Sequence, residues 1–219
     1  MTGPAAPDAP VTEQAQAATK AAVFRSAERL FALHGFQKVS VRDITADAGV
    51  NLASVNYHFG SKDALLWDIF GHRAGELNRE RARMLHEASD RANGQPALRD
   101  ILEALLAPPL KWADPANDRR ISVQFLIRAR SEGTAQMREA LRNDVSHLAR
   151  FAEALKTACP HLSPETVYWR LHFVLGMAHN NRFAEFDRLN HLSGGLTREG
   201  DVPALLKRML DFAEAGFRA

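Results

Sequence analysis

The sequence has one cysteine among its 219 residues, Cys159, so the chain cannot form an internal disulfide bond. It has no run of about 18 consecutive apolar residues, the minimum for a membrane-spanning helix. Its first residues, MTGPAAPDAPVTEQ, show no basic segment followed by an apolar one, so we expect no secretory signal. These absences predict a soluble, cytoplasmic protein that binds no membrane.

The sequence also lacks a large charge of either sign. Its 28 Lys and Arg residues nearly balance 26 Asp and Glu residues, which leaves a net charge of +2. A partner as acidic as nucleic acid must therefore be met by locally concentrated positive charge. The apolar fraction of 46% is enough for a sizeable core in one large domain or two smaller ones.

Signatures of catalysis are missing as well. No two of the nine histidines are three or four residues apart, so no helical pair of metal ligands exists. The sequence contains no GxxxxGK[ST] phosphate loop and no glycine-rich nucleophile elbow. We therefore expect a protein that is not an enzyme, with no metal site and no cofactor.

Apolar residues recur at helical spacing through most of the chain, and no segment shows the pattern of a strand or hairpin, which predicts an all-α fold. Residues 1–17, rich in Ala and Pro, are predicted to be a disordered arm. In the long fourth helix, Arg79, Arg81 and Arg83 are interpreted as a solvated face. The predicted helices cover residues 19–34, 41–48, 52–58, 62–87, 98–107 (ended by Pro108 and Pro109), 119–131, 136–157, 164–188 and 203–215.

The stretch from Val41 to Leu66, VRDITADAGVNLASVNYHFGSKDALL, is the most informative part of the sequence. Ser40 and Asp43 have the spacing of a capping box, which predicts a helix that begins at Val41. Gly49 supplies a sharp turn, and Ile44 and Val55 lie where two short helices share one core. The pattern predicts a helix-turn-helix whose second helix enters the major groove of DNA.

Polar side chains with suitable chemistry lie on the predicted outer face of this motif. Asparagine can pair with adenine edges, and hydroxyl and imidazole groups suit bases and phosphates. Lys62, in the first turn of the next helix, and Arg42 are candidates for phosphate contacts. The predicted DNA-binding residues are Arg42, Thr45, Asn51, Ser54, Asn56, Tyr57, His58 and Lys62. The competing interpretation is three ordinary short helices with polar surfaces.

Residues 19–66 resemble the TetR family of bacterial repressors, above all in the run from Ala48-Gly49-Val50 to Tyr57-His58-Phe59 with Ser61-Lys62. The resemblance implies that Tyr57, His58 and Lys62 contact the DNA backbone, and that Asn51, Ser54 and Asn56 face the bases. It also implies a DNA-binding domain over residues 18–64 and a helical ligand-binding and dimerisation domain over residues 65–219. Thr45 and Asn51 replace a common alanine and a common serine, which leaves the operator sequence open.

By the same resemblance, the C-terminal helices form a homodimer and enclose an inducer pocket. The segment that begins at Pro164 is apolar on more than one face, as expected for a helix buried on all sides. Together with the last helix it is predicted to form half of an intersubunit four-helix bundle, so that the dimer reads a palindromic operator. The alternative is that both helices pack only within one subunit.

The run PHLSPETVYWRLHFVLGM resembles the PsrA-type branch, which implies a fatty acid or acyl-CoA as the inducer that releases the repressor. Aromatic side chains could line an apolar pocket, with a polar residue holding a head group. The alternatives are an aromatic or drug-like inducer, a ligand-independent DNA-binding or interaction protein, and a plain hydrophobic core. The predicted ligand-binding residues are Trp67, Phe70, Trp112, Phe125, Arg128, Trp169, His172, Phe173, Met177 and Asn180.

Overall fold

The computed structural model of the chain describes residues 13–180, 186–197 and 201–219. These residues form eleven α-helices and no strand, which confirms the all-α class. None of the described helices is long and apolar enough to span a bilayer. The helices are α1 (Glu13–His34), α2 (Val41–Ala48), α3 (Ala53–Phe59), α4 (Lys62–Arg91), α5 (Leu98–Ala113), α6 (Arg120–Glu132), α7 (Ala135–Asn143), α8 (Ser146–Ala158), α9 (Pro164–Asn180), α10 (Phe186–Leu192) and α11 (Val202–Arg218).

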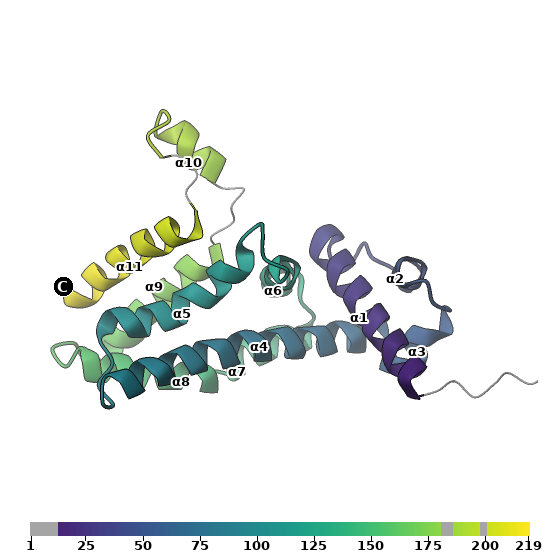
Figure 1. Cartoon of the computed structure of the whole chain (residues 1–219), viewed down its shortest axis with the longest axis horizontal. Helices are drawn as coiled ribbons and strands as arrows, with labels where there is room; N and C mark the ends of the chain where they lie inside the picture. Colours follow the sequence, from purple (N-terminus) through teal and green to yellow (C-terminus); the bar gives the residue numbers. More distant parts are fainter. Residues whose placement is uncertain (1–12, 181–185, 198–200) are drawn as a thin grey trace, which may run out of the picture.

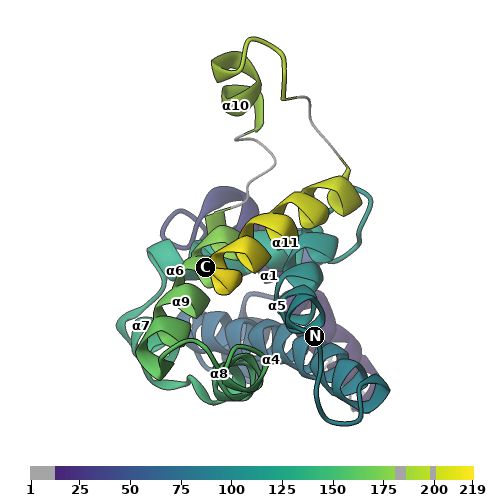
Figure 2. The ribbon, with the colours of Figure 1, turned by 90° about the vertical axis from the view of Figure 1, so that its left-hand side faces the viewer.

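Helix α4 connects the two ends of an elongated molecule (Figure 1). Helices α1, α2 and α3 gather around its first turns, and α5 packs along its remaining length. Helices α8, α9 and α11 surround α5 at the far end. Figure 2 shows α10 standing away from this body.

The described residues form two large hydrophobic cores and a small third cluster of Leu77, Trp112 and Val123. The two large cores do not correspond to two consecutive parts of the sequence. The core of α1–α3 includes Ile44 and Val55, but also Phe125 from α6 and Met137 from α7. The other core joins α5, α8, α9 and α11 with the end of α4. The predicted boundary between residues 64 and 65 thus falls inside α4, and the N-terminal unit depends on helices far along the chain.

Helix α1 begins at Glu13, six residues earlier than predicted. Residues 13–17, assigned to the disordered arm, therefore form the first turns of this helix, and the rest of that arm lies outside the described residues. Glu13 places an acidic group in the first turn, where it complements the helix dipole. The alanine content that indicated a flexible segment equally favours a helix.

Helix α5 runs through Pro108 and Pro109, where the sequence predicted its end. Pro109 has no N–H, so the carbonyl of Leu105 loses its helical donor. The Nε of Arg81 on α4 donates a hydrogen bond to this carbonyl over 3.0 Å. Burial of both prolines in the core, together with this replacement donor, stabilises a helix that prolines ordinarily interrupt.

Two predicted long helices are also divided. The segment 136–157 forms α7 and α8, separated at Asp144 and Val145. The hydroxyl of Ser146 donates to a carboxylate oxygen of Asp144 over 2.8 Å, and such a local bond competes with continuation of the helix. The helix is therefore interrupted here although the segment contains no glycine or proline. In the segment 164–188, α9 is described to Asn180 and α10 begins at Phe186, while residues 181–185 lie outside the described part.

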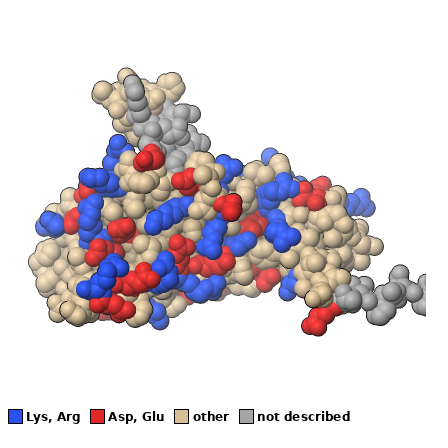
Figure 3. All heavy atoms as spheres, viewed as in Figure 1, with Lys and Arg blue, Asp and Glu red and all other residues tan. Residues whose placement is uncertain are grey.

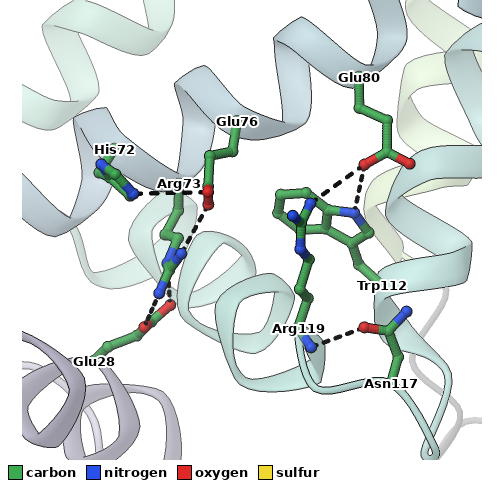
Figure 4. A network of polar contacts seen from close by, with 8 residues as sticks. All are labelled: Glu28, His72, Arg73, Glu76, Glu80, Trp112, Asn117 and Arg119. Carbon is green, nitrogen blue, oxygen red and sulfur yellow. Dashed lines mark hydrogen bonds and ion pairs between the residues drawn. The ribbon is translucent and has the colours of Figure 1, made fainter.

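A buried ion pair fastens α1 to α4 (Figure 4). Glu28, only 4% exposed, accepts two hydrogen bonds of 2.7 Å from Arg73, which also binds Glu76. Burial by itself would lower the pKa of Arg73, but its hydrogen bonds to Glu28 and Glu76 outweigh that effect and raise the pKa. The guanidinium therefore stays charged, and the pair ties the N-terminal unit to the helix that leads into the second core.

Replacing Glu28 with alanine should lower the free energy of unfolding by about 3 kcal/mol, because the substitution leaves Arg73 buried without its bidentate partner. Urea denaturation followed by circular dichroism measures this change. Glu87→Ala is the matched control, because it removes the carboxylate of an exposed pair with Arg83 and should cost less than about 1 kcal/mol. Equal losses in the two variants would contradict a special role for the Glu28–Arg73 pair.

Candidate DNA-binding surface and ligand cavity

The start of α2 has the capping box that the sequence predicts. The amide of Asp43 donates to the Ser40 hydroxyl over 3.2 Å, and the Ser40 amide donates to the Asp43 carboxylate over 2.8 Å. Two hydrogen bonds lower the pKa of Asp43: the one from the Ser40 side chain has the larger effect, and the one from the Ser40 backbone amide the smaller. Gly49 ends the helix with φ at 67°, the left-handed conformation that glycine adopts without strain. These local contacts fix how α3 follows α2.

Helix α3 turns two polar side chains fully outward. Tyr57 is 71% exposed, and Asn56 beside it is exposed as well. The His58 ring is half-buried and meets the Tyr57 ring edge-on, with 4.9 Å between the centroids. Ser54 is also half-buried. The Oδ1 of Asn51 accepts the amide of Ala53 over 2.9 Å, so this side chain is engaged at the start of the helix.

Positive charge is concentrated around the helix-turn-helix. The net charge of the whole chain is only +2, so binding to DNA needs such a local excess. Residues 18–62 hold six Lys and Arg residues against three Asp and Glu residues. Arg42, at the start of α2, is exposed, whereas Arg29 is paired with Asp47. Over the body of the molecule, basic and acidic side chains alternate without a face of one sign in the view of Figure 3.

Two predicted DNA-binding residues have their polar groups engaged within the protein. Thr45 is only 4% exposed, and its hydroxyl lies within hydrogen-bond distance of the Val41 and Arg42 carbonyls. The Nζ of Lys62 donates to the carbonyls of Phe36 and Val39, each over 3.0 Å. Lys62 therefore secures the loop between α1 and α2, a contact that sequence spacing alone does not reveal.

A largely enclosed cavity of about 340 Å³ lies between α4, α5, α6, α7, α8 and α9, and its wall includes the exposed residues Arg130, Asp144 and His172. Most of its wall is apolar, and it includes Phe70, Leu77, Leu110, Val123, Leu126 and Leu175. Its polar side chains are Asn78, Arg81, Arg130, Asp144, His147 and His172. An apolar wall with a few polar groups is the usual construction of a small-molecule site.

A second hollow, of about 650 Å³, lies between the ends of α4 and α8 and the start of α5. Its lining includes exposed residues such as His86, Gln95 and Arg150. This groove is more open to solvent, and none of the predicted ligand-binding residues lines it. The enclosed cavity is therefore the better candidate for a ligand site.

Of the predicted ligand-binding residues, Phe70 and His172 line the enclosed cavity. The others whose side chains are described do not. Trp67 and Phe125 pack in the core of α1–α3, and Met177 packs against the core of the C-terminal helices. The side chain of Asn180 lies outside the described residues.

Three more of these predicted residues lie on other surfaces. Trp112 is buried between α4 and α5 and donates its indole N–H to Glu80 over 2.8 Å (Figure 4). Trp169 and Phe173 are 56% and 61% exposed, and their rings stack on the outer face of α9. Arg128 binds backbone carbonyls at the end of α1. Aromatic character marked these residues as candidates, but helix orientation decides which of them reach the cavity.

Arg81 is the cavity residue that sequence reasoning missed, since it was interpreted as solvated. It is 4% exposed, and arginine is almost never buried to this extent unless it is paired. The available signal was its position: Phe70, Ala74, Leu77 and Arg81 follow at helical spacing, so Arg81 continues the buried stripe of α4. Arg130 stands in the same relation to Leu126 and Ile127 on α6.

Burial, together with the smaller effect of the charge of Arg130, lowers the pKa of Arg81 to about 10. Partial desolvation also lowers the pKa of Arg130, although much of this residue is exposed. Burial lowers the pKa of His147 as well, and the positive charge of Arg81 adds to this effect. The cavity therefore holds two guanidinium groups that remain protonated at neutral pH and an imidazole that favours its neutral form.

Among residues 13–180, 186–197 and 201–219, no three His, Cys, Asp or Glu side chains cluster as metal ligands. The helix-turn-helix at one end and the enclosed cavity at the other define the class: a helical, DNA-binding regulator with a ligand-binding domain. Two family models match the chain. "Bacterial regulatory proteins, tetR family" covers residues 23–69, and "Tetracyclin repressor-like, C-terminal domain" covers residues 103–216, more than half of the chain. The chain belongs to the TetR family of bacterial transcriptional regulators.

Solved structures share this fold at low sequence identity. NalD, the secondary repressor of the MexAB-OprM multidrug efflux pump in Pseudomonas aeruginosa, has a TM-score of 0.61 at 17% identity, over 93% of this chain and 98% of that one. FadR, a fatty acid degradation regulator from Bacillus halodurans, has a TM-score of 0.55 at 14% identity, over 89% and 94%. No curated protein sequence matches the chain. These likenesses show the fold alone, and the PsrA-type branch stays a prediction.

Replacing Lys62 with alanine should destabilise the protein by about 2 kcal/mol, because the Phe36 and Val39 carbonyls lose a charged donor. Chemical denaturation measures the loss. Lys38→Ala serves as the control, since Lys38 is an exposed lysine in the same loop. If both variants unfold at the wild-type denaturant concentration, the two hydrogen bonds of Lys62 contribute nothing to stability.

Proposed function

We propose that the protein is a repressor that binds a palindromic DNA operator as a homodimer in the cytoplasm and is released from it by a small, largely apolar ligand. The single observation that carries the proposal is the double role of α6, which packs into the N-terminal core on one face and lines the enclosed cavity on the other. A ligand in the cavity therefore touches a helix on which the DNA-binding unit is built. Family membership supports a regulator rather than an enzyme.

The two faces of α6 follow from its helical periodicity. Val123, Leu126, Ile127 and Arg130 line the cavity, whereas Phe125, Arg128, Ala129 and Glu132 face the N-terminal unit. Each set has the i, i+3, i+4, i+7 spacing of one helix face. Both sets lie on one rigid element, so a shift that accommodates a ligand is carried to the opposite face.

The contacts of α6 with the end of α1 are specific. The Nε of Arg128 donates to the Ala32 carbonyl over 2.9 Å, and its Nη2 donates to the Leu33 carbonyl over 3.2 Å. Glu132 accepts the amide of Phe36 over 3.0 Å. These bonds hold the last turn of α1 and the loop that leads to α2. If ligand binding displaces α6, the orientation of α2 and α3 changes, and DNA affinity falls by linkage.

On the DNA side, the surface of α3 supplies the base and phosphate contacts in this proposal. Asn56 is exposed and suits an adenine edge, and Tyr57 reaches out as far as a phosphate contact needs. Arg42 adds an exposed charge at the start of α2. Ser54 and His58 lie at the margin of this surface, while Asn51, Thr45 and Lys62 act mainly by holding it in shape.

Arg42→Gln should weaken binding to every DNA duplex and reduce the slope of log affinity against log salt by about 1, because one phosphate contact is lost. Fluorescence anisotropy with duplexes enriched from a random-sequence pool measures both quantities. Arg150→Gln on α8 removes an exposed charge far from α3 and should leave the slope unchanged. A wild-type slope in the Arg42 variant would remove this residue from the interface.

For the dimer, α9 and α11 supply the surface. These helices contact each other, and α9 exposes Trp169 and Phe173 while α11 exposes Phe212, which is 73% accessible. Exposed aromatic side chains gathered on adjacent helices are typical of subunit interfaces. A twofold dimer through these helices presents two copies of α3 to one operator, which multiplies affinity and fixes the half-site spacing.

Trp169→Glu should convert the dimer to monomer at micromolar concentration, because the interface would bury an unpaired charge. Sedimentation velocity measures the change. Leu33→Glu is the control: Leu33 is also an exposed apolar residue, but it lies on α1, away from α9 and α11. A Trp169 variant that sediments as the wild type does would place the interface elsewhere.

A fatty acid or an acyl-CoA is the ligand that the PsrA-type resemblance favours, and the apolar cavity wall supports it. An aromatic or drug-like inducer remains the alternative within the same class. A ligand-independent DNA-binding or interaction protein is the remaining alternative, and the enclosed cavity next to α6 argues against it. Thermal-shift screening with these ligand classes, followed by operator binding in their presence, distinguishes the three.

A further inference from the structure

The charges of the enclosed cavity are out of balance. Arg81 and Arg130 both line it, and among the described residues neither forms an ion pair with a carboxylate. Among the described residues of the wall, Asp144 is the only acidic one; it is exposed and accepts a hydrogen bond from Ser146. Arg81 is buried, whereas Arg130 is exposed on part of its side chain. By contrast, Arg73, whose side chain is 19% exposed, binds two carboxylates.

Arg81 is fixed in place by its bond to the Leu105 carbonyl, which occupies only Nε. An arginine has five N–H donors, so the two terminal nitrogens are left for other partners. Taking a charge out of water is costly unless the charge is paired. An arginine that is 4% exposed and lacks a carboxylate partner in the described structure therefore indicates that its counterion comes from outside the chain.

His147 supplies an independent observation at the same place. Its Nδ1 is buried and has no hydrogen-bond partner, although the residue lines the cavity together with both arginines. Buried polar atoms are nearly always satisfied, by protein, water or ligand. Arg81 and His147 are brought to the wall of one cavity from α4 and α8.

We propose that this cavity binds the anion of an apolar carboxylic acid, with its carboxylate between Arg81 and Arg130 and beside His147, and its tail along Phe70, Leu126 and Leu175. This assignment rests on the proposed function and narrows its ligand to a free acid. At the end of the acyl chain, a thioester has a neutral carbonyl in place of the carboxylate, and this carbonyl cannot neutralise the arginines. Neutral and cationic drug-like compounds fail for the same reason.

The cavity volume agrees with this choice. At about 340 Å³ it lies near the lower end of the roughly 300–1,000 Å³ typical of ligand sites. It can enclose an acid of moderate length, whereas the large coenzyme A group of a thioester has to stay outside. Arginine also suits a carboxylate by geometry, because its planar donors match the two oxygens.

Isothermal titration calorimetry of the full-length protein with four ten-carbon probes tests the assignment: decanoate, 1-decanol, decyltrimethylammonium and decanoyl-CoA. We expect decanoate to bind at least about tenfold more tightly than the other three. In Arg130→Gln, decanoate should lose about tenfold in affinity while 1-decanol is unaffected. Arg120→Gln, an exposed position on the same helix, should bind every probe as the wild type does. Arg81→Gln is a second variant, but its bond to Leu105 makes it a risk for folding.

Equal affinities for decanoate and 1-decanol, tighter binding of decanoyl-CoA, or an Arg130→Gln variant with wild-type decanoate affinity would overturn the assignment, as would no binding of any probe. Operator binding, measured separately, tests the proposed function. Selective decanoate binding that leaves DNA affinity unchanged would sustain the carboxylate site and refute the ligand-released repressor. If only the other probes release the protein from DNA, the ligand-released repressor would be sustained and the carboxylate site refuted.

Discussion

The structure depends on one constraint, that α6 belongs to two packed regions simultaneously. Phe125 fills the core around α1, with its ring 5.3 Å from that of Phe36, while Leu126 beside it faces the cavity. Cores packed as densely as crystals transmit displacement rather than absorb it. Neither region can rearrange its α6 face without the other responding. A regulator needs such a shared element, because a ligand can alter DNA binding only through a structure whose two states it distinguishes.

The cavity owes its charge to the way α5 is built. Both prolines of α5 are buried in the core, and Pro109 leaves the Leu105 carbonyl without its helical donor. Arg81 supplies a donor from α4 and is thereby held in the interior, and among the described residues its terminal nitrogens form no ion pair with a carboxylate. A local requirement of helix continuity thus places a cation where an apolar side chain would otherwise pack. The same arrangement sets a preference for the sign of a ligand's charge.

Much of the N-terminal unit could be predicted from the sequence, because its determinants are local. Ser40 and Asp43 lie three residues apart, and Gly49 needs only its own left-handed conformation, so the bounds of α2 follow from short segments. The hydrogen bonds of Lys62 could not be predicted, since the Phe36 and Val39 carbonyls that accept them lie 26 and 23 residues away in the sequence. Its charge and position suited a phosphate contact equally well. In the C-terminal half, aromatic character indicated pocket residues, yet Phe125 and Trp169 face opposite environments, a core and the surface.

The sequence by itself determined the helical class, the helix-turn-helix and the resemblance to the family, because periodicity, capping and turn chemistry act over a few residues. Only the tertiary structure decided that α5 continues through its two prolines, that the segment 136–157 forms two helices, and that Arg81 is buried. Each of these outcomes depends on groups supplied by another helix or by a competing local bond, whose effect is settled when the helices pack. The cavity belongs to this second kind, since six helices must meet before its polar end exists.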